Sequence, residues 1–246
     1  MTLEDIVEKL KAALPGIRSV ILYGSAAAGD YSPRGSDYNL LVVVDHLGLE
    51  ELDRAAAAIR RWTAAGNPPP LLFTTQRLRE STDSFPIEIA DMKQARRVLF
   101  GEDVLEHLQV RTEHLRLQLE RELKEKIISL RQGYLAAGGR PRALGRLLLA
   151  SLPSVLTLMR AALRLFREPV PLRKLDAARR LREYADFDLE VLEILHEWRY
   201  GGRTVPGGDR RELFRRYLEV VEKVADCVNN LSATEKEEPK CEPESG

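Results

Sequence analysis

The spacing of hydrophobic residues divides the chain into two parts with different predicted structures. In the first part, apolar residues recur at helical spacing over residues 3–14 and 49–65, and these stretches alternate with short apolar runs bounded by turn residues. Apolar runs of this length are typical of buried strands. The predicted strands are Ser19–Tyr23, Tyr38–Val44, Leu71–Thr74 and Pro86–Ala90. Residues 1–105 are therefore expected to form one domain that contains a mixed sheet.

From Glu113 onward the hydrophobic spacing is helical throughout. The predicted helices cover residues 113–138, 144–166, 172–184, 189–200 and 210–231. Pro153 is expected to break or kink the second of them, because proline lacks the N–H that an α-helix uses. Several helices joined by short connections indicate a helical bundle. The predicted fold class is therefore α+β, with an N-terminal mixed-sheet domain at residues 1–105 and a C-terminal all-α helical bundle at residues 111–231.

Composition narrows the protein class. The chain is 44% hydrophobic and 31% charged, as in soluble globular proteins. It has no uninterrupted run of about 18 apolar residues, so a membrane span is not expected, and its start lacks the basic and apolar segments of a signal peptide. Cys227 and Cys241 show no metal-ligand spacing and are expected to be free thiols. We therefore expect a cytoplasmic protein with no membrane partner, and a disordered tail at 232–246, where apolar residues give way to Glu, Pro and Lys.

The formal net charge of zero hides two blocks of opposite sign. Basic residues dominate from Arg140 to Arg182, and acidic residues dominate from Glu183 to Glu197. The blocks could form a dipolar surface for a polar ligand, or they could be helix faces that pair with each other. The basic block could also serve nucleotidyl transfer to a nucleic acid, although the neutral total argues mildly against that partner. Trp198, which follows the acidic block, is expected to be a core or domain-contact residue.

The first predicted strand ends in small residues that suit phosphate binding. At Gly24–Ser25, backbone N–H groups and a hydroxyl can approach phosphate oxygens without interference from a large side chain. Asp37 begins the next predicted strand, and position 39 points to the same side because strand side chains alternate. Two oxygen ligands beside a phosphate-binding turn could hold Mg²⁺ together with a nucleoside triphosphate.

The segment with Gly24–Ser25, then Arg34-Gly-Ser-Asp37 and an apolar strand, resembles the nucleotidyltransferase superfamily of polymerase-β-like enzymes. The Val98–Asp103 stretch resembles the end of the catalytic domain in two-domain adenylyltransferases of the aminoglycoside-modifying type, whose second domain is a helical bundle. The resemblance implies that Gly24, Ser25 and Ser36 contact the nucleotide and that Asp37 is a catalytic metal ligand. It also implies a third carboxylate on a following strand, for which Glu88 is the best match and Asp91 the second.

The resemblance implies transfer of a nucleoside monophosphate from a triphosphate, ATP foremost, to a small hydroxylated acceptor with Mg²⁺. Glu88 could also act as the base that deprotonates the acceptor. The chain departs from the family pattern at Asn39, where a second Asp is expected, and an amide lacks the full charge of a carboxylate. The alternative is therefore a catalytically lapsed nucleotide-binding or regulatory module, which could act with a protein partner. In both cases Asp37, Asn39 and Glu88 are expected to converge beside Ser25.

Overall fold

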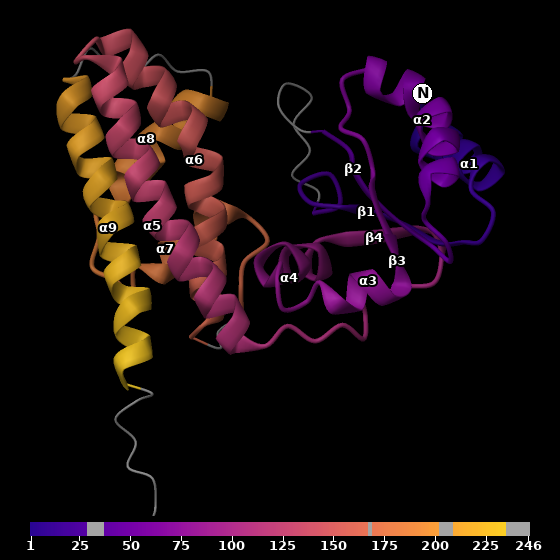
Figure 1. Cartoon of the computed structure of the whole chain (residues 1–246). Helices are drawn as coiled ribbons and strands as arrows, with labels where there is room; N and C mark the ends of the chain where they lie inside the picture. The colour runs from indigo at the N-terminus through magenta and orange to yellow at the C-terminus, as the bar shows by residue number, and fades with distance from the viewer. Residues whose placement is uncertain (29–36, 167–168, 202–208, 235–246) are drawn as a thin grey trace, which may run out of the picture. The chain divides into compact units, whose positions relative to one another are not determined.

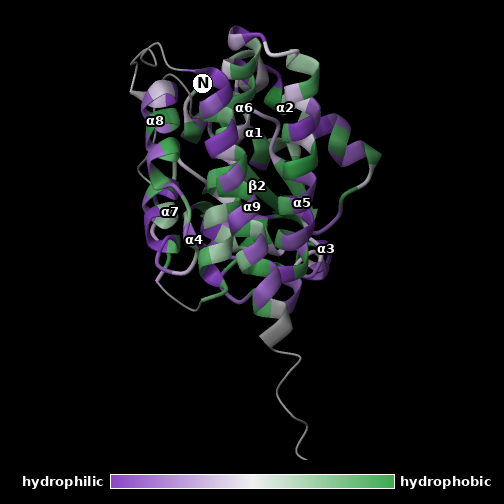
Figure 2. Ribbon diagram, turned by 90° about the vertical axis from the view of Figure 1, so that its left-hand side faces the viewer, coloured by the Kyte–Doolittle hydropathy of each residue, from purple (hydrophilic) through white to green (hydrophobic). Residues whose placement is uncertain are grey.

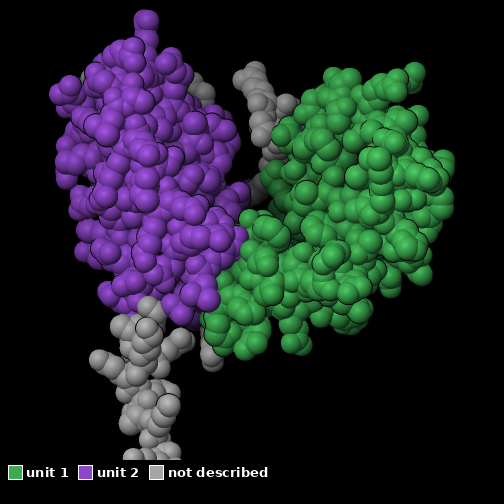
Figure 3. Space-filling view, viewed as in Figure 1, with its two compact units in different colours: residues 1–115 green, residues 116–246 purple. Residues whose placement is uncertain are grey.

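The computed structural model describes residues 1–28, 37–166, 169–201 and 209–234 (Figure 1). The chain divides into two compact units, Met1–Leu115 and Arg116–Gly246 (Figure 3). Each unit buries its own set of apolar side chains. The structure therefore has an α+β fold, with a mixed sheet in unit 1 and helices in unit 2.

Unit 1 contains a four-stranded sheet with the order β3-β2-β1-β4. The strands are β1 (Ile17–Tyr23), β2 (Asn39–Val44), β3 (Leu71–Thr74) and β4 (Arg96–Gly101). Strand β1 is antiparallel to both β2 and β4, whereas β2 and β3 are parallel and are connected through helix α2 (Leu49–Ala64). The sheet is therefore mixed, as predicted, and the two central strands are β1 and β2.

Helices cover both faces of this sheet. On one face, alternate residues of β1 and β2 pack with α1 (Leu3–Ala13) and α2 in a cluster that includes Trp62. On the other face, Ile21, Leu41 and Val43 pack with α3 (Thr75–Glu80) and α4 (Pro86–Gln94). Coverage of both faces explains why β2 is apolar along nearly its whole length.

The predicted strand Pro86–Ala90 is wrong, because these residues begin α4. Pro86 occupies the first turn, where its fixed φ suits a helix and its missing N–H costs nothing. The alternation of Ile87 and Ile89 imitates a strand, yet Ile89 and Met92 lie three residues apart and pack together against the sheet. The remaining strand of the sheet is β4, which the sequence pattern did not predict.

Unit 2 is a helical bundle, as predicted. Its helices are α5 (Thr112–Ala137, whose first turn belongs to unit 1), α6 (Pro141–Arg164), α7 (Lys174–Leu181), α8 (Leu189–Tyr200) and α9 (Arg210–Thr234). Hydrophobic and hydrophilic residues alternate along α5 and α9, as expected of helices with one buried side (Figure 2). Helix α9 continues past Leu231 to Thr234, so the predicted tail starts too early, and residues 235–246 lie outside the described residues.

Helix α6 is the core of the bundle and packs against α7, α8 and α9. It is long and apolar enough to cross a membrane by length and composition alone, but 56% of its most apolar window is buried inside the fold. The helix runs through Pro153 without a break. The carbonyl of Leu149, which a proline cannot bond, accepts a hydrogen bond from Nη1 of Arg199 on α8 at 2.9 Å. A side chain thus replaces the hydrogen bond that Pro153 removes.

Candidate functional site

The turn after β1 is open at its backbone. Gly24 has a φ of +81°, its N–H donates to the carbonyl of Ala95 at 3.0 Å, and its own carbonyl accepts from the N–H groups of residues 27–28 at 3.0 Å. Within the described ranges, no group accepts a hydrogen bond from the N–H of Ser25 or Ala26, and Ser25 is exposed. Two neighbouring backbone donors and a hydroxyl can bind an anion such as a phosphate group.

Asn39 lies beside this turn. It is the first residue of β2 and pairs with Tyr23, the last residue of β1. A Cβ atom built on Gly24 would lie 3.6 Å from the amide nitrogen of Asn39. The Asn39 amide therefore lies directly beside the Gly24 backbone. Because paired residues share a face, Asn39 faces the α4 side of the sheet together with Tyr23.

Asp37 precedes β2 and is exposed. Between it and Asn39, Tyr38 packs its ring on Trp62, with the ring centroids 6.0 Å apart, and its N–H donates to Oδ1 of Asn67 at 3.3 Å. These contacts turn Tyr38 toward the α2 side of the sheet, so in an extended segment its two neighbours point the other way. Ser36, a predicted nucleotide contact, lies outside the described residues.

The predicted third carboxylate is not on a strand. Glu88 lies on α4 and its side chain is exposed, whereas Oδ1 of Asp91 is buried. Ala95 follows α4, and its carbonyl accepts the hydrogen bond from the N–H of Gly24. Asp91 lies one helical turn before Ala95, and Glu88 lies about 10 Å from Ala95 along the helix axis. Both carboxylates therefore come from the helix that covers the Asn39 side of the sheet. Strand β3, the neighbour of β2, has no acidic residue.

Asp37 and Asn39 together form a small donor set for a metal ion. Within the described ranges, no group of three or more His, Cys, Asp or Glu side chains is placed to hold a metal. Mg²⁺ needs fewer protein ligands, because it keeps several waters and takes one or two carboxylates plus substrate phosphates. One carboxylate and one amide oxygen beside the open turn would fit one such ion, with less charge than two carboxylates would supply.

Sequence reasoning missed the cations that flank the other side of β1. Arg96 on β4 pairs with Tyr23 from the side opposite Asn39, and its guanidinium forms an ion pair with Asp103 at 2.8 Å. Lys93 donates a hydrogen bond to the carbonyl of Leu108, and burial, followed by the charge of Arg96, lowers its pKa. In the sequence, the signal for this cation was the Arg96–Arg97 pair. It could not be placed at the end of β1 without first predicting strand β4.

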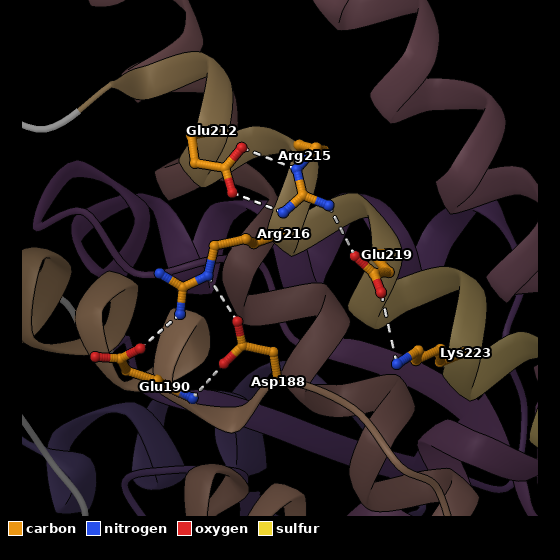
Figure 4. A network of polar contacts seen from close by, with 7 residues as sticks. All are labelled: Asp188, Glu190, Glu212, Arg215, Arg216, Glu219 and Lys223. Carbon is orange, nitrogen blue, oxygen red and sulfur yellow. Dashed lines mark hydrogen bonds and ion pairs between the residues drawn. The ribbon is translucent and has the colours of Figure 1, made fainter.

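Acidic residues of the block at 183–197 form ion pairs within unit 2. Arg179, from the basic block, contacts Glu193 of the acidic block at 2.8 Å. Arg216 of α9 binds both Asp188 and Glu190 at 2.6 Å, and its hydrogen bond lowers the pKa of Asp188 (Figure 4). These three acids are neutralised by arginines of the protein itself, so they do not support the hypothesis of a dipolar surface for a polar ligand.

A mixed sheet with an open turn after its first strand, followed by a helical bundle, makes this an α+β fold. Among solved structures, the chain is similar to spectinomycin adenyltransferase AAD(9) from Enterococcus faecialis, determined with ATP and spectinomycin. The TM-score is 0.58 and the sequence identity 15%, over 93% of this chain and 100% of the other. No family model and no curated protein matches the sequence. The similarity therefore shows the fold.

Proposed function

We propose that this protein is a nucleotidyltransferase that transfers a nucleoside monophosphate, from ATP foremost, to a hydroxyl group of a small acceptor. The observation that carries the proposal is the open turn after β1, where the N–H groups of Ser25 and Ala26 and the Ser25 hydroxyl lie next to Asn39. The similar adenyltransferase structure contains ATP and spectinomycin, which supports this reaction class. We also propose a cytoplasmic location, in which both cysteines stay reduced.

Different residues around the turn would bind different parts of the nucleotide and its metal ion. Gly24 keeps the chain compact where the phosphates approach, and Ser25 donates to them. Ser36 is proposed as a further nucleotide contact. Asp37 and Asn39 would hold Mg²⁺, which when bound neutralises phosphate charge and fixes the triphosphate for attack. The protein thus contributes orientation and charge rather than covalent chemistry.

In the transfer step, the acceptor oxygen attacks the α-phosphorus, and the bond from that phosphorus to the bridging oxygen breaks. Pyrophosphate leaves, and the hydroxyl proton passes to a carboxylate. We assign that role to Glu88 rather than Asp91, because Glu88 is exposed and can reach an incoming acceptor, whereas Oδ1 of Asp91 is buried. A metal role for Glu88 has less support, since Glu88 extends from a helix and not from a strand beside β2.

The second candidate is a nucleotide-binding module of the same fold that has lost catalysis and regulates a protein partner. It is favoured by Asn39 at the metal position and by the absence of an acidic residue on β3. A site with one firm carboxylate ligand can still bind a triphosphate through its backbone donors, but it stabilises the charge of the reacting phosphate less well.

Pyrophosphate release with MgATP and a panel of aminocyclitol and aminoglycoside acceptors separates the two candidates. A transferase should release pyrophosphate only with an acceptor; Asp37→Asn should abolish release, and Glu88→Gln should slow it at least tenfold, roughly what a general base contributes. Glu106→Gln, an exposed acid elsewhere in unit 1, is the matched control and should keep full activity. ATP binding without release supports the second candidate, and no triphosphate binding refutes both.

A further inference from the structure

Unit 2 contains a pocket that the proposed transfer reaction does not use. It has a volume of about 330 Å³ and lies between the start of α6, the end of α8 and the start of α9. Its walls include Trp198 and Leu149 as apolar parts and three arginines, Arg142, Arg146 and Arg210. A pocket of this size with one aromatic wall and several converging polar groups is typical of a small-molecule site.

The aromatic wall has a fixed position. A Cβ atom built on Gly145 would lie 2.7 Å from the Cη2 atom of Trp198, so only a glycine lets the indole lie against α6. The guanidinium of Arg210 lies over the same indole, with its Cζ 4.2 Å from the ring centroid. Trp198 therefore lies between α6 and the cation of Arg210, and it is only partly buried, so it is not the core residue that the sequence suggested.

The arginines of the pocket differ from Arg179 and Arg216 of the same bundle. Arg179 and Arg216 bind carboxylates, whereas in the described part of the chain no carboxylate pairs with Arg142, Arg146 or Arg210. Nη1 of Arg210 is buried, and no described residue accepts a hydrogen bond from it.

The helix terminus adds to this positive charge. The first turn of α6 lines the same pocket and has neither an acidic residue nor a side-chain cap. The positive end of its helix dipole is therefore also left without a negative partner. A buried donor without an acceptor is costly, and an anionic ligand would remove that cost.

We propose that this pocket binds a small planar anion, which has a phosphate or carboxylate group attached to a flat apolar body. Arginine side chains bind both groups bidentately, and the apolar body would pack on Trp198 and Leu149. The site goes beyond the proposed transferase function, because it lies entirely within unit 2 and shares no residue with the Gly24 turn.

Calorimetry on the full chain with phenyl phosphate, benzoate, inorganic phosphate and phenol tests both parts of the ligand. Phenyl phosphate or benzoate should bind with one site per chain, and inorganic phosphate and phenol at least tenfold more weakly. The stronger of the first two identifies the anionic group. Equal binding of phenol would overturn the role of the arginines, and equal binding of inorganic phosphate would overturn the role of the aromatic wall.

Variants assign the binding to this pocket. Arg142→Gln and Arg146→Gln change exposed side chains and should fold normally, yet each should weaken the best ligand at least tenfold. Arg182→Gln, an exposed arginine of the same unit outside the pocket, should leave binding unchanged. Equal affinity in all variants, or no binding at millimolar ligand, would overturn the proposal. Displacement of the ligand by ATP would also overturn it, because the site would then be a nucleotide site.

Discussion

Replacing Gly24 by alanine tests the proposed phosphate-binding turn, because its cost in stability can be calculated. At a φ of +81° an L-residue is strained, which costs about 1–2 kcal/mol. The nearest atom to the new methyl would be Nδ2 of Asn39 at 3.6 Å, an ordinary contact, so no clash adds to that cost. The methyl would nevertheless occupy space beside Asn39, where the phosphates are proposed to lie. ATP affinity should therefore fall at least tenfold, about 1.4 kcal/mol.

Gly66 supplies the matched control for this change. Its φ is +91°, and a Cβ there would meet no atom within 4 Å, so Gly66→Ala should cost about the same 1–2 kcal/mol of stability. Urea denaturation followed by tryptophan fluorescence gives the loss of stability, and calorimetry gives the ATP affinity. Both variants should lose stability, and only Gly24→Ala should lose nucleotide binding. Equal ATP affinities in the two variants would refute the assignment of the turn.

Three further changes test other parts of the structure. Asn39→Asp adds a charge to the proposed metal ligands, so calorimetry with a non-hydrolysable triphosphate should show Mg²⁺ binding about tenfold tighter. Unchanged affinity would mean that position 39 is not a ligand. Arg199→Met should lower the free energy of unfolding, measured in urea, by about 1 kcal/mol, because it removes the hydrogen bond to the Leu149 carbonyl. The loss should be smaller in a Pro153→Ala background, where the N–H of residue 153 can bond that carbonyl. Equal losses in the two backgrounds would contradict this. Because Arg216 holds the pKa of Asp188 below its usual value of about 3.9, their pairing stabilises the fold above that pH and is lost as the pH falls through the lowered pKa. Thermal melts from pH 7 downward should show less acid destabilisation in Asp188→Asn than in the parent, and parallel curves would exclude this contribution.

Hydrophobic spacing was sufficient to predict most elements, and it failed where two patterns compete. Helix α8 and strand β3 have the predicted bounds because their apolar residues fit one period and their ends carry turn residues. Pro86-Ile-Glu-Ile fits a strand equally well, and only its packing on the sheet makes it helical. Strand β4 begins with two arginines, and its pairing with β1 provides the stability that its own sequence does not indicate.

The candidate site was predictable where it depends on neighbouring strands. Asn39 lies beside Gly24 because β1 and β2 pair in register, which follows from two apolar runs and the segment that joins them. The third carboxylate was not predictable, since its position depends on whether residues 86–90 form a strand or a helix. The pairing of Arg179 with Glu193 depends on how two helices pack, and sequence left that choice open.

The most direct test of the account is calorimetric titration of ATP into the full chain, with and without Mg²⁺. The parent should bind one ATP per chain with an affinity that depends on Mg²⁺, and Asp37→Asn should weaken that binding at least tenfold. Asp53→Asn, an exposed acid on α2, should bind as the parent does. Absence of binding at millimolar ATP, or an Asp37→Asn variant that binds MgATP as tightly as the parent, would contradict a nucleotide site at the end of β1.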